Sequence, residues 1–219
     1  MANINVIDYW TFASAANSAD FGDLTQARRH IHDSRGSNGT RGMVCGGYTS
    51  GNVDTVDYVN IASIGNAQDF GNLSAAGREK AGSNSETRLC ITGGYNSLNV
   101  IDYFTMASTG NATDFGDLAT GDHGAGGCSN GTRGLHFNGE DNQIQVYVIA
   151  STGNATDFGD SLRTATYGSA CSDLTKGVFG GGSGPIDSLD VVNIASNGNA
   201  TDFGNLVVAR HSIASASGT

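Results

Sequence analysis

The amino-acid sequence predicts an all-β protein of five repeated units, each forming one small antiparallel sheet. Three observations predict this fold class. An Asp-Phe-Gly step recurs roughly every 45 residues along the 219-residue chain. Alternating apolar and polar residues, as in strands, are separated by glycine-rich turns, and the chain has 33 glycines but one proline. No stretch of about ten residues shows the 3.6-residue periodicity of an amphipathic helix.

The second unit illustrates the strands that we expect in each repeat. Residues 54–62 alternate apolar and polar side chains, which predicts a strand with both faces partly buried. A turn containing Gly65 and Asn66, which adopt positive φ at low cost, precedes a short strand that begins at Asp69. Small and polar residues follow, and residues 87–95 predict a last strand that ends in a glycine pair. Four short strands per unit are typical of a propeller blade.

The repeat predicts a single domain over residues 1–219, a five-bladed β-propeller of four-stranded antiparallel blades. The repeat units lie near residues 6–48, 56–95, 101–139, 145–182 and 190–219. A β-solenoid of stacked parallel coils is the alternative, although its coils are usually shorter than these units. A chain of this size buries roughly 70% of its unfolded surface, which is enough for a substantial core.

The chain begins partway through a unit, and this predicts how a ring of blades would close. We expect residues 210–217 to pair as a strand with the first blade, in the same sheet as residues 5–13. Five strands of the Asp-Tyr type stand against only four strands of the glycine-pair type. The glycine-pair strands lie near residues 43–47, 89–94, 134–139 and 177–182. One blade is therefore short of a strand, which residues 2–5 or a neighbouring chain would supply, and an open strand edge is a candidate partner contact.

Composition and charge argue against several functional classes. The formal net charge is −10, with 11 basic and 21 acidic residues, so we expect no binding to nucleic acid, which requires a basic face. No run of 18 apolar residues is present, so we expect no insertion into a membrane. The first residues lack a basic start followed by an apolar run, and we expect no signal peptide and synthesis in a cytoplasm.

The four cysteines are expected to be free, buried thiols. Cys128 and Cys171 hold the same place in consecutive units, where Cα atoms usually lie farther apart than the roughly 7 Å that a disulfide spans. Cys45 and Cys90 are expected to be free as well. No Cys-x2-Cys pair indicates a zinc site.

The Asp-Phe pair of each unit is the strongest internal signal. A calcium site at Asp114 and Asp117 is one hypothesis, but the spacing does not match a calcium-binding loop and no bidentate glutamate follows. We therefore expect the aspartate to cap a turn and the phenylalanine to fill the space between blades. The pairs are Asp20 and Phe21, Asp69 and Phe70, Asp114 and Phe115, Asp157 and Phe158, and Asp202 and Phe203.

Other polar residues are candidates for contacts. A cation follows a threonine in four units and is expected to pair with aspartates between blades or to rim a surface for an acidic ligand. These cations are Arg41, Arg88, Arg133 and Lys176. The segment 28–35 is the densest positive patch, and we expect His30 and His32 to share one face of a strand. Residues 140–145 also depart from the repeat, with Gln145 where other units have Asp, either as a contact loop or by drift. The expected partner-docking residues are Arg28, Arg29, His30, His32, Arg35, Glu140 and Asp141.

The chain contains none of the sequence patterns that carry common chemistry. There is no nucleophile elbow, His-Glu-x-x-His motif, phosphate-binding loop or dinucleotide fingerprint. We therefore expect no catalytic residue, no cofactor-binding residue and no metal ligand, and hence no enzyme.

The glycine pairs at Gly46, Gly93 and Gly180, followed by Tyr58 or Tyr103 and then Phe70 or Phe115, resemble the signature of kelch repeats. The match departs from kelch in having Phe instead of Trp as the second aromatic, and a longer hairpin before it. The amino-acid sequence of the repeat, Ile-Ala-Ser-Thr-Gly-Asn-Ala-Thr-Asp-Phe-Gly-Asp-Leu, is similar to kelch-like repeats in structural proteins of marine bacteriophages, especially those of cyanobacteria. The resemblance covers nearly the whole chain and brings no set of catalytic residues.

This resemblance implies a non-enzymatic structural component of a phage particle, either a head decoration or a tail appendage. Its partners would be other virion proteins and a host surface polysaccharide, with homo-oligomers formed through particle symmetry. It would be made in the host cytoplasm and reside in the virion. The alternatives are a carbohydrate-binding propeller, against which the few aromatic residues count, and an enzyme on the same scaffold.

Overall fold

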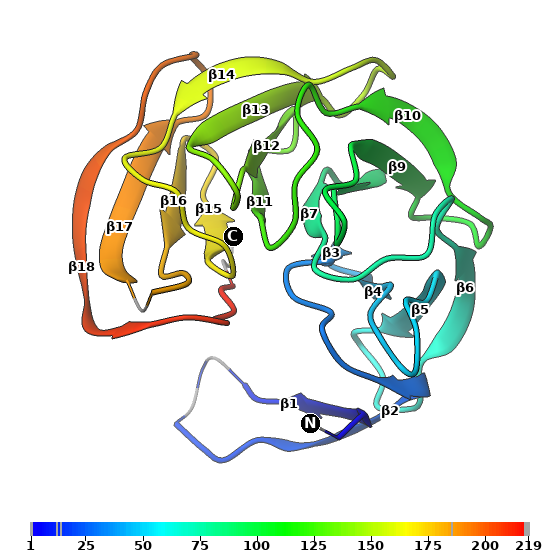
Figure 1. Ribbon diagram of the computed structural model, residues 1–219. Coiled ribbons are helices and arrows are strands. Elements are labelled where there is room, and N and C mark those ends of the chain that lie inside the picture. The colour runs from blue at the N-terminus through cyan, green and yellow to red at the C-terminus, as the bar shows by residue number, and fades with distance from the viewer. Residues whose placement is uncertain (1, 12, 14, 185, 217–219) are drawn as a thin grey trace.

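The protein is all-β, as its sequence predicts. The computed structural model in Figure 1 describes residues 2–11, 13, 15–184 and 186–216, and the elements in these ranges are strands, with no helix. The strands form five antiparallel sheets arranged around a common centre (Figure 1). Four sheets have four strands and one has two. The described part of the chain accordingly offers no helix long and apolar enough to cross a membrane.

The sheets follow one another along the chain. The first sheet consists of β1 (Ile4–Tyr9) and β2 (Ala19–Arg28). The second consists of β3 (Arg35–Ser37), β4 (Arg41–Cys45), β5 (Thr55–Asn60) and β6 (Gln68–Asn72). The third consists of β7 (Ala81–Asn84), β8 (Arg88–Thr92), β9 (Val100–Thr105) and β10 (Thr113–Asp117). The fourth consists of β11 (Gly126–Ser129), β12 (Arg133–Phe137), β13 (Gln143–Val148) and β14 (Thr156–Asp160). The fifth consists of β15 (Ser169–Ser172), β16 (Lys176–Gly180), β17 (Ile186–Asn193) and β18 (Thr201–Arg210).

Each four-stranded sheet is a meander in which consecutive strands are neighbours. The first strands β3, β7, β11 and β15 lie nearest the centre and contact one another in that order (Figure 1). The last strands β6, β10, β14 and β18 form the outer rim (Figure 1). This arrangement matches the radial sheets predicted from the repeat, and it does not match the stacked coils of a solenoid.

The hydrophobic core lies between neighbouring sheets. Met43 of the second sheet clusters with Leu89 and Phe104 of the third. Phe137 of the fourth sheet stacks on Phe179 of the fifth with ring centroids 5.2 Å apart. Because each sheet buries its apolar residues against the next one, the sheets depend on their neighbours for stability, as expected of repeat proteins.

A glycine bulge interrupts each outer strand, and in the first four sheets it lies against a turn of the following sheet. The ladder between β5 and β6 shifts register between Val56 and Asp57, opposite the Asp-Phe-Gly step of β6. Gly71 in this step has φ of 144°, and a Cβ atom there would lie 2.3 Å from the carbonyl oxygen of Gly110 in the next repeat. The glycine is therefore required both by its backbone conformation and by the close approach of the neighbouring turn.

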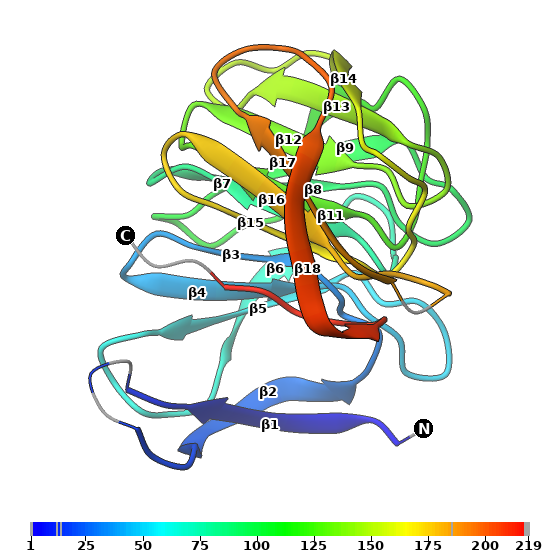
Figure 2. The ribbon, with the colours of Figure 1, turned by 90° about the vertical axis from the view of Figure 1, so that its left-hand side faces the viewer.

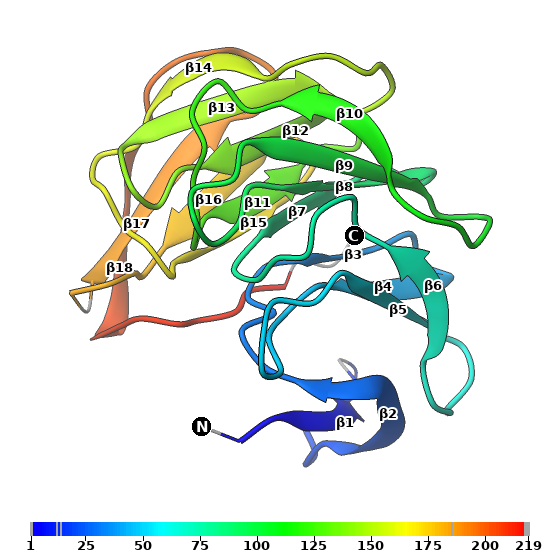
Figure 3. The same cartoon turned by 45° about the vertical axis from the view of Figure 1, so that its right-hand side comes forward.

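The predicted pairing of residues 210–217 with residues 5–13 is not found in the described chain, where β1 pairs with β2 and with no other strand. Residue 217 of the first range and residue 12 of the second lie outside the described residues. The segment after β18 instead runs back beside β15 towards β3 (Figures 2 and 3). The N–H of Ser212 donates to the carbonyl of Tyr167 at 2.9 Å, and the hydroxyl of Ser215 donates to the carbonyl of Ala170 at 2.7 Å. Arg35 donates to the carbonyl of Ser215 at 2.7 Å.

The prediction that one blade is short of a strand of the glycine-pair type agrees with the two-stranded first sheet. Residues 2–5 do not fill the empty place as a separate strand, because β1 itself begins at Ile4. The segment 211–216 takes the innermost place next to β15, while β1 and β2 lie farther out. The place between them, which β4, β8, β12 and β16 occupy in the other sheets, has no strand in the described chain.

Candidate functional site

The repeated signature forms the joint between consecutive sheets. At the first joint, the carbonyl of Phe21 accepts a hydrogen bond from the N–H of Gly65 at 2.9 Å. The carbonyl of Asp23 accepts one from Ala67 at 2.8 Å, and its N–H donates to Asn66 Oδ1 at 3.1 Å. The same three bonds recur at the three following joints. They join Phe70 and Asn72 to residues 110–112, Phe115 and Asp117 to residues 153–155, and Phe158 and Asp160 to residues 198–200.

The Asp and the Phe of the signature take the structural roles expected for them where the contacts are resolved. The Oδ1 atom of Asp114 accepts the N–H of Gly116 at 3.1 Å, which caps the bulge. Phe70 meets Tyr58 and Phe104 edge-on, with ring centroids 5.7 Å apart in both pairs. The signature phenylalanine thus joins its own sheet to the next one.

A buried polar contact accompanies each of these joints. Asp57, which is fully buried, accepts the N–H of Thr25 at 3.1 Å and binds Arg28 at 2.9 Å. Arg163 and Asp190 form the equivalent pair at 2.5 Å between the fourth and fifth sheets. Arg28 is 1% exposed, so this residue is unavailable to a partner and its expected role in docking is wrong.

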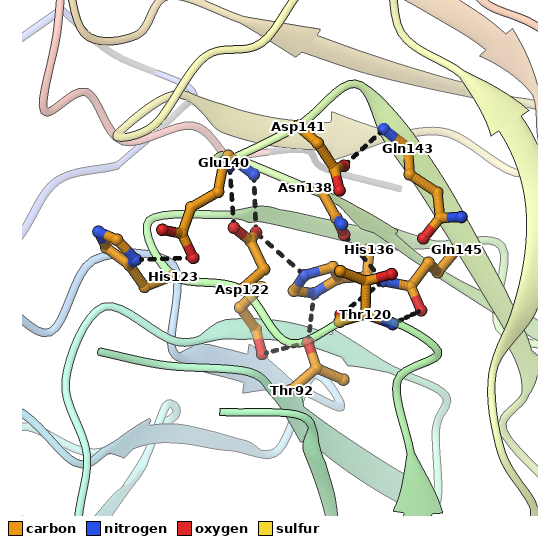
Figure 4. Close-up of polar contacts among 12 residues, drawn as sticks. Thr92, Thr120, Asp122, His123, His136, Asn138, Glu140, Asp141, Gln143 and Gln145 are labelled. Carbon is orange, nitrogen blue, oxygen red and sulfur yellow. Dashed lines mark hydrogen bonds and ion pairs between the residues drawn. The ribbon is translucent and has the colours of Figure 1, made fainter. Parts of the chain in front are cut away.

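Gln145 replaces the aspartate at the joint between the third and fourth sheets (Figure 4). Its side chain is fully buried, accepts the N–H of Ala119 at 2.6 Å and donates to the carbonyl of Thr120 at 3.0 Å. Its amide also donates to Asn138 at 2.9 Å. A neutral amide satisfies these backbone groups without a buried cation, which gives Gln145 a structural role at this joint.

Thr92, His136 and Asp122 form a buried chain beside Gln145 (Figure 4). The hydroxyl of Thr92 lies 2.8 Å from His136 Nδ1, and His136 Nε2 lies 3.3 Å from Asp122 Oδ2. Burial raises the pKa of Asp122, but the contact with His136 and two backbone N–H donors outweigh burial and lower it overall. All three residues are at most 1% exposed, and their contacts join the third and fourth sheets.

The row of cations does not pair with aspartates as predicted. Arg41 instead lies over the ring of Tyr58 at 4.7 Å and donates to the carbonyl of Met106 in the next sheet at 2.7 Å. Arg88 lies over Tyr103 at 4.5 Å and donates to the carbonyl of Ile149 at 3.1 Å. Arg133 and Lys176 likewise lie over Phe158 and Phe203. The three arginines therefore join neighbouring sheets through carbonyl groups, whereas the ring under Lys176 belongs to its own sheet.

Aromatic, histidine and arginine side chains gather where the chain enters the inner strands. We call this group the axial cluster. It consists of Arg29, His30, His32, Tyr48, Arg78, Glu79, Tyr95, His123 and Tyr167. Arg78 lies over the rings of Tyr95 at 3.6 Å and Tyr48 at 4.7 Å. The buried carboxylate of Glu79 lies 3.3 Å from both Arg78 Nε and the hydroxyl of Tyr167.

The backbone beneath the axial cluster is linked by hydrogen bonds that run from one repeat to the next. The N–H of Glu79 donates to the carbonyl of His30 at 3.1 Å, and Gly124 donates to Glu79 at 3.0 Å. Tyr167 donates to Gly124 at 2.8 Å, and Ser212 continues the series to Tyr167. The cluster therefore stands on an ordered framework at the centre of the sheets.

His30 and His32 do not share a strand face, which corrects the sequence prediction. Both lie in the loop between β2 and β3 with φ of 56° and 55°. Burial lowers the pKa of His32, although nearby Asp33 and Glu79 act in the opposite direction. Its ring meets Tyr167 edge-on at 6.1 Å.

The structure brings only part of the predicted docking set together. Arg29, His30 and His32 belong to the axial cluster, and Glu140 joins it through His123 Nδ1 at 3.1 Å (Figure 4). Asp141 caps the N–H of Gln143 (Figure 4), and Arg35 pairs with Asp33 at 2.8 Å, so both have structural partners.

Sequence reasoning missed the three tyrosines of the axial cluster. Tyr48 and Tyr95 each follow a glycine pair directly, and this shared position is the signal that was available. Tyr167 has no equivalent signal in its repeat.

The four cysteines are free, as predicted, although Cys171 is only half-buried. Burial raises the pKa of Cys90 to about 12 and raises that of Cys45 further, so these thiols stay protonated and inert. In the described ranges, no three His, Cys, Asp or Glu side chains are grouped to hold a metal ion.

An open cavity of about 1230 Å³ lies at the opposite end of the inner strands from the axial cluster. It extends from the turns at Asn38, Asn84 and Asn130 to the apolar side chains of Ile7 and Leu24 in the first sheet. The cavity therefore reaches from the centre of the molecule to the space beside β1.

No protein-family model matches the chain, and no curated protein sequence matches it either.

Proposed function

We propose that the five sheets are the blades of a kelch-like five-bladed propeller whose ring closes between β18 and the first sheet. Phe203 is 53% exposed, whereas the signature phenylalanines of the other four repeats are 2–8% exposed because a following sheet covers them. Arg210 holds the place in its repeat that Arg28 holds in the first, and Asp8 holds the place of Asp57. A fifth joint between β18 and the first sheet would have the same contacts as the four joints that are formed.

The closing contacts follow from the equivalent positions. Arg210 would bind Asp8, and the N–H of Asn205 would donate to the side chain of Asn17, which corresponds to Asn66. The segment 211–216 already bridges β15 and β3 through Ser215, so closure would bring the outer first sheet against β18.

The propeller is, in this proposal, a non-enzymatic structural component of a phage particle, as a head decoration or tail appendage. The observation that supports a structural role is that the repeated polar residues form hydrogen bonds between consecutive sheets at every joint. The kelch-like sequence of the repeat supports the assignment to a phage, and this assignment would place the protein in the virion. The axial cluster lies at the centre of the sheets, where a rigid disc would present it to a virion protein or host surface polysaccharide.

Many copies on a symmetric particle would strengthen weak single contacts, because each further contact is made at high effective concentration. Association with particles tests this role. Antibody detection in particles purified by density gradient is expected to give a fixed number of copies per particle, retained after a high-salt wash. Absence from washed particles, with the protein recovered only in the soluble fraction, refutes the role.

The axial cluster supports carbohydrate binding as a second candidate function. Its three tyrosine rings are partly exposed and lie beside Arg29 and Arg78, a combination suited to an acidic polysaccharide. A glycan array that includes acidic and neutral polysaccharides tests it. Binding to acidic glycans that weakens in Tyr48→Ala would support this function, and an array without signal would dismiss it.

A further inference from the structure

The first sheet has an empty place for one strand. In the other four sheets, the second strand lies between the inner strand and the third strand and pairs with both. In the first sheet, β1 corresponds to the third strand and β2 to the fourth. Within the described residues, the edge of β1 that faces the centre has no paired strand. An unpaired edge presents its backbone N–H and C=O groups to any extended segment that fits.

The neighbouring sheet shows what the missing strand would cover. Met106, Ile149 and Ile194 each follow a third strand and are at most 1% exposed. Their carbonyl groups accept hydrogen bonds from the cation that begins the second strand of the preceding sheet. Ile61 holds the same place after β5 but is 44% exposed, since the preceding sheet has no second strand.

Other side chains beside the empty place are exposed as well. Tyr58 and Tyr103 have an arginine from the second strand over their rings, whereas Tyr9 lies on β1, which has no second strand to supply one. Tyr9 is 37% exposed and the adjacent Trp10 is 59% exposed. A cation and apolar side chains on an added strand would cover these rings.

The cavity next to β1 has the size and lining for a peptide segment. Its volume of about 1230 Å³ exceeds the roughly 300–1,000 Å³ typical of pockets for small molecules. Ile7 and Leu24 line it from the first sheet, Val44 and Val59 from the second, and Ala216 from the segment after β18. These are the elements that would surround a second strand in this sheet.

We propose that this groove binds an extended segment of a partner polypeptide, which adds to β1 as the missing second strand of the first blade. The four second strands of this chain define its chemistry. They begin with a cation and continue with apolar residues, as Arg41–Cys45, Arg88–Thr92, Arg133–Phe137 and Lys176–Gly180. A cationic segment is also favoured by the net charge of −10 on this chain.

A second copy of the chain is a poorer occupant than a different partner. Each of its four second strands is already paired on both edges, so donating one would break a complete sheet. The inference names a class of partner for the proposed structural role and rests on that role for its biological setting. The strand addition itself is tested without particles, so either idea can fail alone.

The test uses the fluorescence of Trp10, the one tryptophan of the chain, which lies at the end of β1. The probe is a peptide with the sequence of residues 175–182, Thr-Lys-Gly-Val-Phe-Gly-Gly-Gly, which has no tryptophan of its own. We expect a saturable blue shift as the strand covers the indole ring. The same peptide with Phe179→Asp is expected to bind about tenfold more weakly, because its buried apolar side chain becomes a charge.

Two protein variants keep the test specific to the groove. Ile61→Asp places a charge at the exposed position after β5 that a second strand in the first sheet would cover, and it is expected to weaken binding of the peptide about tenfold. Ile64→Asp is the matched control, since Ile64 is 66% exposed in the same turn, and it is expected to bind like the unmodified protein. Circular dichroism establishes that both variants fold.

Three results would overturn the proposal. The first is a peptide titration without a saturable change in the fluorescence of Trp10. The second is equal affinity for the unmodified protein and Ile61→Asp. The third is a dimer in analytical ultracentrifugation that Ile61→Asp abolishes and Ile64→Asp does not, because this outcome assigns the groove to a second copy of the chain.

Discussion

Replacing the same phenylalanine at two joints tests whether the ring closes in solution. Phe158 is 2% exposed between the fourth and fifth sheets, with Arg133 over its ring at 5.3 Å. Phe158→Ala is expected to lower the free energy of unfolding by about 3–5 kcal/mol, because it removes a buried ring and leaves a cavity. Phe203 is 53% exposed in the structure, so the same change there would cost only about 1 kcal/mol if the joint stays open.

Closure predicts a different result for Phe203→Ala. If the first sheet covers Phe203 in solution, Phe203→Ala should lower the free energy of unfolding nearly as much as Phe158→Ala does. For a domain of this size, a difference of about 3 kcal/mol corresponds to a shift in Tm on the order of 10 °C. Thermal unfolding followed by far-ultraviolet circular dichroism, together with the fluorescence of Trp10, measures both variants. A small decrease in Tm for Phe203→Ala together with a large decrease for Phe158→Ala would refute closure.

Three further predictions concern groups that the structure places in specific roles. Arg28→Ala is expected to lower the free energy of unfolding by about 3–5 kcal/mol, because it leaves Asp57 charged and unpaired in the first joint. Urea denaturation should also show that the double change Arg28→Met and Asp57→Leu lowers it by less than the sum of the two single changes. Gly71→Ala should destabilise by well over about 1 kcal/mol, because its Cβ would overlap a backbone carbonyl oxygen, whereas Gly51→Ala meets no atom within 4 Å and should be nearly neutral in the same assay. Burial lowers the pKa of His32 in the folded state, so the unfolded chain binds this proton first as the pH falls through 6.5. The free energy of unfolding should therefore decrease below that pH. His32→Gln should reduce the decrease in Tm that is measured between pH 7 and 5.

The repeat makes the sheets predictable from sequence, because strand periodicity and glycine turns act locally. Residues 54–62, for example, contain β5 (Thr55–Asn60) almost as predicted. The partners of the polar residues were not predictable in the same way. Asp57 meets Arg28 of the preceding repeat, and Arg41 meets a carbonyl group of the following one, and both contacts depend on how two sheets face each other.

The axial cluster shows where sequence patterns give too little information. His30 and His32 alternate as strand residues would, but the chain turns there with positive φ at both positions. Local periodicity cannot reveal a loop whose conformation is set by contacts such as the bond from Glu79 N–H to the carbonyl of His30. The cluster also collects tyrosines from three repeats, and no short motif in any one repeat marks them as neighbours.

The empty place in the first sheet and the open joint at Phe203 are two aspects of one structural weakness. A sheet in this architecture is stabilised by its neighbours, and the first sheet has a formed joint on one side only, between Phe21 and the turn at Gly65. A strand added to β1 would pair its free edge, cover Ile61 and increase the apolar surface facing the fifth sheet. Since a ligand that binds only the folded sheet stabilises it by about 2.7 kcal/mol at 100 times its Kd, partner binding and ring closure would favour each other. On the two proposals made above, closure of the ring would therefore depend on binding of the partner segment.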